Sequence, residues 1–253
     1  MYPQYNRKNT FTKITLYYLY MELPTFNKER EIVAQGQYFA VGIDEAGRGP
    51  LAGPVVASAV VYKYPDFTYP LELTKAFTLI RDSKKLSERK REEAFALIQE
   101  HFYVGVGIIN AETIDRVNIL QATFLAMKGA LSDLKRQLPK DGREVYLLLD
   151  GNQLLPGYSG AQETVIGGDG TVRSIAAASI IAKVTRDRMF EEYEKAYPEY
   201  GFGKHKGYGT KVHMDALRKF GPTPIHRVSF KPVKLALPEN VNKRFDRELK
   251  PRK

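Results

Sequence analysis

Cysteine is absent from the 253-residue sequence, and no apolar run is long enough to cross a membrane. The absence of cysteine excludes a disulfide scaffold, a zinc–cysteine site and a thiol nucleophile, and it fits a reducing compartment. The longest nearly apolar run, residues 51–62, covers 12 residues, whereas a membrane helix needs about 20. We therefore expect a cytoplasmic protein with no membrane-spanning segment.

The N-terminal region contains one short apolar stretch, residues 14–21, preceded by Lys13. Because this stretch is aromatic and lacks a small-residue cleavage site, we do not expect a signal peptide. The sequence leaves open whether the protein starts at Met1 or at Met21. We assign residues 1–37 to an N-terminal extension.

Positive charge is in excess, with 39 Lys and Arg against 29 Asp and Glu, a net charge of +10. Residues 231–253 hold eight basic and three acidic residues, so this segment carries a net charge of +5, half of the total. A surplus of this kind indicates a polyanionic partner, most often nucleic acid, although a merely solvated basic tail is the alternative. We assign residues 234–253 to a basic C-terminal tail.

Along residues 38–233, segments with the hydrophobic pattern of a strand alternate with segments whose apolar residues recur at the helical spacing of three to four residues. Strands are expected at residues 39–44, 54–62, 102–109, 145–149 and 163–166. Helices are expected near residues 26–35, after a candidate N-cap at Ser87, and at residues 119–138, 172–193 and 211–220. Strands followed by helices predict an α/β domain with a mixed central sheet flanked by helices.

Acidic residues stand where two of these strands end. Asp44 shares one strand face with Ala40, and the adjacent carboxylates of Asp44 and Glu45 repel each other unless a cation lies between them. Asp150 ends a buried strand, and strand ends of one open α/β sheet share a crevice. Asp169 precedes the long helix. The alternatives are a charged strand end in water and, for Asp169, a plain helix N-cap.

Carboxylates without cysteine predict Mg²⁺ or Mn²⁺ rather than zinc. Two such ions about 3.5–4 Å apart can activate water and stabilise the leaving oxygen of a phosphodiester. The four carboxylates therefore suit a two-metal phosphodiesterase.

Other residue types near these acids suit a nucleic-acid substrate. The turn Gly47-Arg48-Gly49 leaves its backbone open to a sugar or phosphate. Lys84 offers an ammonium group to phosphate, and Tyr208 lies between basic residues and glycines, as a stacking platform would. Each has a plain structural alternative: a turn, a solvated loop and a packed tyrosine.

Asp187 follows Lys183 by one helical turn and is flanked by Arg186 and Arg188. We interpret Asp187 as a member of an ion pair, with contact to a metal ion as the alternative. His205, His213 and His226 are interpreted as packing or phosphate contacts rather than metal ligands.

The motifs in this order resemble one family, type 2 ribonuclease H, in its bacterial ribonuclease HII group. The matching segments are residues 42–56 (GIDEAGRGPLAGPVV), 82–87 (DSKKLS), 149–152 (LDGN), 168–169 (GD), 175–187 (IAAASIIAKVTRD), 205–210 (HKGYGT), 221–227 (GPTPIHR) and 229–230 (SF). Together they span residues 38–233 in the family's order. In the sister ribonuclease HIII group the position of Arg48 differs, which favours HII.

The resemblance implies an RNase H-like fold with a small C-terminal helical segment. It implies a monomeric enzyme that cleaves the RNA strand of RNA–DNA hybrids and incises on the 5′ side of single ribonucleotides in duplex DNA, leaving 5′-phosphate and 3′-hydroxyl ends. The family's catalytic and metal-binding acids fall on Asp44, Glu45, Asp150 and Asp169. Its substrate-binding residues fall on Gly47, Arg48, Gly49, Lys84 and Tyr208. One departure is Gly167, where the family usually has lysine.

Two other classes fit parts of the sequence. A transposase-like or resolvase-like nuclease also uses clustered acids, but its cutting would not depend on a 2′-hydroxyl. A non-catalytic nucleic-acid-binding module would explain the charge without any metal ion.

Overall fold

The computed structural model describes residues 23–68 and 71–237 of the chain. The expectations for the apolar stretch at residues 14–21, for the start at Met1 or Met21, and for most of the basic tail concern residues outside these ranges.

One mixed sheet organises the chain, with strand order β3-β2-β1-β4-β5. The strands are β1 (Tyr38–Ala46), β2 (Val55–Tyr62), β3 (Phe102–Ile109), β4 (Glu144–Asp150) and β5 (Gln162–Val165). β1, β2 and β3 pair antiparallel, whereas β1, β4 and β5 pair parallel. The predicted mixed α/β sheet is confirmed.

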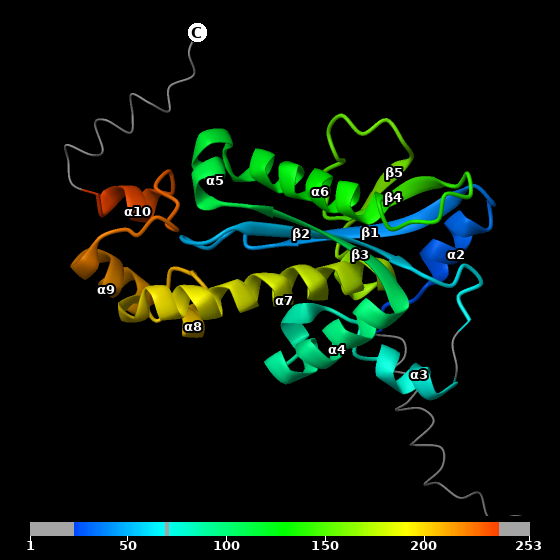
Figure 1. Ribbon diagram of the computed structural model, residues 1–253, viewed down its shortest axis with the longest axis horizontal. Coiled ribbons are helices and arrows are strands. Elements are labelled where there is room, and N and C mark those ends of the chain that lie inside the picture. The colour runs from blue at the N-terminus through cyan, green and yellow to red at the C-terminus, as the bar shows by residue number, and fades with distance from the viewer. Residues whose placement is uncertain (1–22, 69–70, 238–253) are drawn as a thin grey trace, which may run out of the picture.

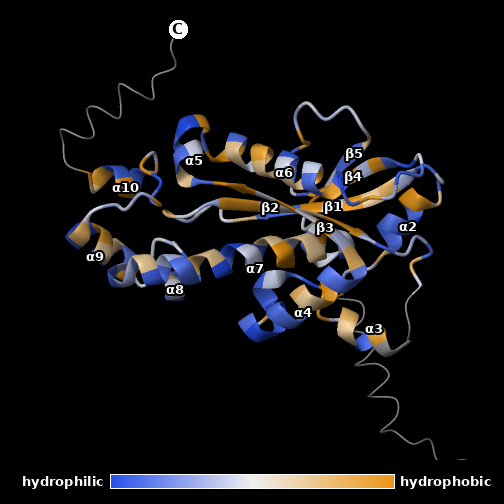
Figure 2. Ribbon diagram, viewed as in Figure 1, coloured by the Kyte–Doolittle hydropathy of each residue, from blue (hydrophilic) through white to orange (hydrophobic). Residues whose placement is uncertain are grey.

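Helices cover both faces of this sheet (Figure 1). One face carries α5 (Ala111–Val117) and α6 (Ile119–Lys135), and the other carries α3 (Leu71–Phe77), α4 (Glu88–His101) and α7 (Arg173–Ala196). The strands are mostly hydrophobic, and the hydrophilic residues gather on the outer helices (Figure 2). Two apolar layers are therefore buried, one on each side of the sheet.

The apolar spacing predicted in the sequence explains the placement of α6. Phe124, Met127, Leu131 and Leu134 recur at intervals of three or four residues, and all are buried in the apolar layer between α6 and the sheet, where α6 lies chiefly on β2 and β3. The prediction at α4 is also confirmed, because the Ser87 side chain accepts a hydrogen bond from the N–H of Lys90. Helix α6 ends at Lys135, three residues earlier than expected.

Short helices complete the ends of the molecule. They are α2 (Asn27–Val33), η1 (Ser83–Lys85), η2 (Gly168–Gly170), η3 (Pro198–Tyr200), α8 (Phe202–His205), α9 (Lys211–Phe220) and α10 (Lys231–Leu235). The small C-terminal helical segment is present as α9 and α10. In the described ranges, no helix combines the length and the apolar character that crossing a bilayer requires.

Helix α2 lies within the expected N-terminal extension but packs against the domain. Phe26 and Ile32 are buried among core residues. A buried Glu29 carboxylate accepts a 2.7 Å hydrogen bond from the N–H of Ser174, at the start of α7. The extension over residues 1–37 is therefore in part a component of the folded core.

The long helix α7 lies directly on β1. A Cβ atom added at Gly42 would lie 2.3 Å from the backbone carbon of Ser174 and 2.4 Å from the nitrogen of Ile175. Such distances are far below ordinary contact, so only glycine allows the two backbones to approach this closely. The contact lies two residues before Asp44 on the same strand face.

We predict that Gly42→Ala lowers the free energy of unfolding by about 1–3 kcal/mol, because the extra methyl group must push α7 away from β1. Urea denaturation followed by circular dichroism measures the change. Gly170→Ala is the control, since a Cβ atom there meets nothing within 4 Å. Equal stability of the two variants would contradict the prediction.

Candidate active site

The carboxyl ends of the parallel strands β1 and β4 bring two acids to one edge of the sheet. Ile43 pairs with Leu149, so Asp44 and Asp150 are the next residues on adjacent strands. A pocket of about 250 Å³ opens there. Its lining includes eight of the predicted site residues: Asp44, Glu45, Gly47, Arg48, Gly49, Lys84, Asp150 and Tyr208.

Asp44 is the most buried of these acids, with 6% of its surface exposed. Burial raises its pKa well above the usual range, and the negative charges of Glu45 and Asp150 raise it further. Its Oδ1 accepts a 2.7 Å hydrogen bond from the Glu45 N–H. Burial also raises the pKa of Glu45, against the lowering effect of Arg48, whose Nη1 lies 3.2 Å from Glu45 Oε1.

The fourth acid, Asp169, is the one predicted site residue that does not line this pocket, but its short helix η2 is tied to Asp150. The N–H of Gly168 donates a 2.7 Å hydrogen bond to Asp150 Oδ1, and this draws η2, which carries Asp169, toward the end of β4. Burial raises the pKa of Asp169, and the charge of Asp150 adds to the rise. The alternative that Asp169 caps the long helix is wrong, because Val172 holds that position and no side chain caps it.

These carboxylates fit a hard divalent cation by donor type and by charge, since like charges held together at low exposure need a positive ion between them. Within residues 23–68 and 71–237, no three His, Cys, Asp or Glu side chains stand in an arrangement that could hold a metal ion as they are placed. One carboxylate oxygen of each of Asp44, Glu45 and Asp150 accepts a hydrogen bond from a donor within the protein.

Lys84 reaches the pocket on η1. Asp82 accepts a 2.9 Å hydrogen bond from the Lys84 N–H, and the hydroxyl groups of Ser83 and Ser179 lie 3.0 Å apart, which ties η1 to α7. The Lys84 side chain is exposed.

The predicted ion pair of Asp187 with the pocket residue Lys183 is confirmed, at 2.6 Å.

Tyr208 lines the pocket beside the glycine turn, half-exposed at 47%. Its carbonyl oxygen is 2.9 Å from His213 Nδ1, and His213 Nε2 is 3.0 Å from His226 Nε2. Because the Thr223 N–H donates to His226 Nδ1, His226 must donate from Nε2 and His213 from Nδ1. His213 and His226 are thus neutral imidazoles in fixed tautomers, and the hydrogen bond from His213 to the Tyr208 carbonyl oxygen fixes the backbone at Tyr208.

The histidines are buried packing residues, as expected from the sequence, and their hold on Tyr208 was not apparent there. Sequence reasoning also missed two buried arginines, Arg186 and Arg227. Burial lowers their pKa values to about 10 and about 9, so both stay cationic at neutral pH. Both arginines lie in segments that match the family, residues 175–187 and 221–227, but residue type alone predicts an exposed side chain for an arginine.

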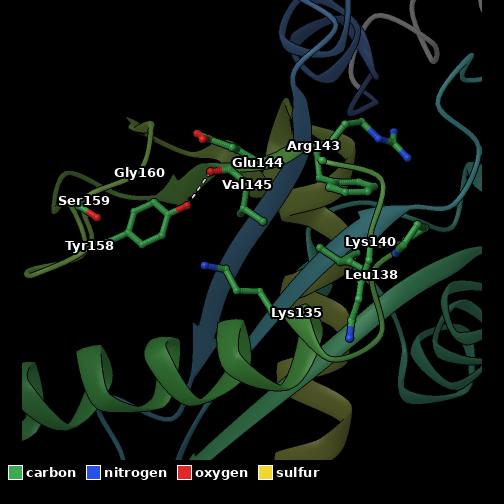
Figure 3. A pocket seen from close by; sticks show the side chains of 12 residues that line it. Lys135, Leu138, Lys140, Arg143, Glu144, Val145, Tyr158, Ser159 and Gly160 are labelled. Atoms are coloured by element: carbon green, nitrogen blue, oxygen red, sulfur yellow. Dashed lines mark hydrogen bonds between the residues drawn. The ribbon is translucent and has the colours of Figure 1, made fainter.

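A larger hollow, of about 570 Å³, lies at the opposite end of β4 (Figure 3). Two of its charged groups, Arg143 and Lys135, already have partners within the protein. Arg143 pairs with Asp141 at 2.6 Å and stacks over the ring of Phe39 at 3.9 Å, and Lys135 lies 5.3 Å from the ring centre of Tyr158. The clustered acids are in the smaller pocket, which is the candidate active site.

A mixed sheet whose central parallel strands end in clustered carboxylates, beside an open glycine turn, defines a hydrolase of the RNase H-like class. The family model described as Ribonuclease HII matches residues 41–233. The chain belongs to the ribonuclease HII family, and it is therefore a type 2 ribonuclease H, a hydrolytic endonuclease.

Individual relatives agree with this assignment. The Ribonuclease HII of Endomicrobium trichonymphae is 51% identical over 209 residues, covering 82% of this chain and 92% of the relative. The ribonuclease H2 structure from Pyrococcus horikoshii OT3 is 24% identical with a TM-score of 0.60, covering 82% of this chain and 98% of that one. The Bst-RNase HIII structure in complex with Mn²⁺ is 18% identical with a TM-score of 0.60, covering 82% and 71%. The two structures show the shared fold.

We predict that His226→Gln flattens the pH dependence of stability. Burial lowers the pKa of His226 from 6.5 to about 3. Between these values the unfolded chain binds a proton that the folded chain does not, so wild-type stability falls as the pH drops. Urea denaturation between about pH 7 and pH 4 should show a slope smaller by up to about 1.4 kcal/mol per pH unit in the variant. Parallel curves would refute the assignment.

Proposed function

We propose that this enzyme cleaves the RNA strand of RNA–DNA hybrids and incises on the 5′ side of single ribonucleotides in duplex DNA, leaving 5′-phosphate and 3′-hydroxyl ends. The observation that carries the proposal is the single pocket shared by an acidic cluster and an open glycine turn. The acids suit phosphodiester hydrolysis, and the turn suits recognition of a sugar. A monomeric, cytoplasmic enzyme remains our expectation.

Four acids would hold the divalent cations, Mn²⁺ or Mg²⁺: Asp44, Glu45, Asp150 and Asp169. Cations bound there supply an activated water and stabilise the leaving 3′ oxygen. The raised pKa values of Asp44, Glu45 and Asp169 support this role, because they report negative charge that the protein alone compensates poorly. Arg48 compensates part of the charge of Glu45.

The remaining pocket residues would recognise the substrate. Gly47, Arg48 and Gly49 present main-chain groups to the 2′-hydroxyl, which RNA alone carries and which both donates and accepts hydrogen bonds. The exposed ring of Tyr208 would stack against the neighbouring sugar, and the exposed ammonium group of Lys84 would contact a phosphate. Tyr208 lies near the turn, since its Cε1 would be 3.8 Å from a Cβ atom at Gly49.

The decisive experiment compares an all-DNA duplex with the same duplex carrying one ribonucleotide, in Mn²⁺ and in Mg²⁺, with the product ends mapped. We expect one cut, on the 5′ side of the ribonucleotide, and none in the all-DNA duplex. Equal cutting of both duplexes would instead indicate a resolvase-like nuclease. Binding without cutting in either metal would indicate a non-catalytic module.

We predict that Asp44→Asn and Asp150→Asn each lower kcat on the single-ribonucleotide duplex by at least about a thousandfold, which corresponds to about 4 kcal/mol of transition-state stabilisation. Each change removes a charge that would bind a cation. Asp141→Asn is the control, because Asp141 is exposed and pairs with Arg143 far from the pocket. Rates near wild type in either active-site variant would refute the metal assignment.

We predict that Tyr208→Ala raises KM by about ten- to a hundredfold, since a stacked base or sugar contributes about 1–3 kcal/mol. Tyr208→Phe keeps the ring and should stay within about threefold of wild type. Steady-state cleavage kinetics separate the two. Equal KM values for the alanine and phenylalanine variants would remove stacking from the proposed role.

A further inference from the structure

The loop between β1 and β2, residues 47–54, presents two backbone donors without a protein acceptor. In the described part of the chain, no hydrogen-bond acceptor serves the N–H of Arg48 or the N–H of Gly49. Both residues are exposed and line the pocket. A pair of adjacent free N–H groups can donate to an oxygen atom of a ligand.

Arg227 holds the opposite side of the same peptide units. Its guanidinium is fully buried and donates to the carbonyl oxygens of Gly47 at 2.6 Å and Arg48 at 3.0 Å. It also donates to the carbonyls of Gly53 at 2.9 Å and Pro54 at 3.0 Å. No carboxylate forms an ion pair with it among the described residues. Its donors are therefore used to fix this loop.

The position of Arg227 is itself fixed by the backbone. The N–H of Arg227 donates to the Leu51 carbonyl at 2.8 Å, and the N–H of Gly53 donates to the Ile225 carbonyl at 2.8 Å. An isolated bridge pairs Ala52 with His226. Residues 225–227 thus form a short antiparallel contact with the 47–54 loop.

In a planar trans peptide unit, the C=O and the N–H point in opposite directions. Arg227 draws the carbonyls of Gly47 and Arg48 inward, so the N–H groups of the same two units, on Arg48 and Gly49, point away from it. We propose that Arg227 is a positioning residue that sets ribose specificity by aiming these two N–H groups at the 2′-hydroxyl oxygen. This inference rests on the proposed function.

Lysine cannot replace arginine in this arrangement. Arginine carries five N–H donors in a planar fork, whereas lysine carries three on one nitrogen atom. Arg227→Lys therefore keeps the positive charge, but the lysine cannot donate to all four carbonyls. The peptide units that follow Gly47 and Arg48 are then no longer held in one orientation.

The test measures cleavage of a single-ribonucleotide duplex, with an all-DNA duplex of the same sequence as competitive inhibitor. In Arg227→Lys we expect kcat/KM to fall about a hundredfold, while the Ki of the all-DNA duplex stays within about threefold of wild type. The reason is that deoxyribose has no 2′-hydroxyl for the two N–H groups to bind. Leu134→Ala is the control for lost stability alone, because Leu134 is fully buried on the α6 face of the sheet. It should leave both constants unchanged.

A second pair of variants covers the case in which Arg227→Lys does not fold. Arg48→Pro removes one of the two N–H groups at a residue whose φ is negative, as proline requires, while the carbonyls bound by Arg227 remain. Arg48→Ala removes the same side chain and its ion pair with Glu45 but keeps the N–H. We expect the proline variant to lose at least about tenfold more kcat/KM than the alanine variant, at similar Ki.

Each outcome is decisive. A parallel loss of kcat/KM and of all-DNA affinity in Arg227→Lys would make Arg227 a merely structural residue, and so would equal activity of the two Arg48 variants. Wild-type activity of Arg227→Lys would also overturn the inference. If the wild-type enzyme itself does not cut the ribonucleotide duplex, the proposed function is refuted. The wild-type reaction therefore separates failure of the proposed function from failure of this inference.

Discussion

Repulsion between carboxylates at the ends of two parallel strands is the constraint around which this molecule is built. The pairing of β1 with β4 places Asp44 and Asp150 side by side, and burial leaves little water to screen them. The surrounding residues offset part of this cost with donors, from the backbone N–H groups of Glu45 and Gly168 and from Arg48. The remaining repulsion lowers the stability of the fold at this edge of the sheet, and the concentrated negative charge attracts cations.

Much of this arrangement follows from the sequence, because it depends on local patterns. A continuous apolar run predicted β4, and apolar spacing of three to four residues predicted α6. Residue content predicted the other two elements: Val and Ala for β2, and Ala and Ile for α7. The acids were predicted as a group because each follows a strand or precedes a helix, where chain geometry limits the choice of partners. Family order then placed the glycine turn, Lys84 and Tyr208 in the same pocket, as the structure has them.

What could not be predicted is long-range. Phe26, at the N-cap of α2, and Glu29 and Ile32 within α2 belong to the predicted N-terminal extension. Their burial depends on contacts with α7 and the sheet, which are distant in the chain. Arg227 and His226 carry polar side chains that are usually exposed. Their burial follows from hydrogen bonds to backbone groups distant in the chain, for which side-chain periodicity has no signal.

The short contact between residues 51–53 and 225–227 has a consequence for the biogenesis of the enzyme. The acids and the sheet are complete once α7 has formed, but the 47–54 loop acquires its anchor from a segment more than 170 residues further along, as the separation of Arg227 from Pro54 shows. A nascent chain that ends before residue 225 would carry all four carboxylates yet lack the hydrogen bonds by which Arg227 fixes this loop. During synthesis, the final shape of the loop is therefore set only after the acidic cluster has formed.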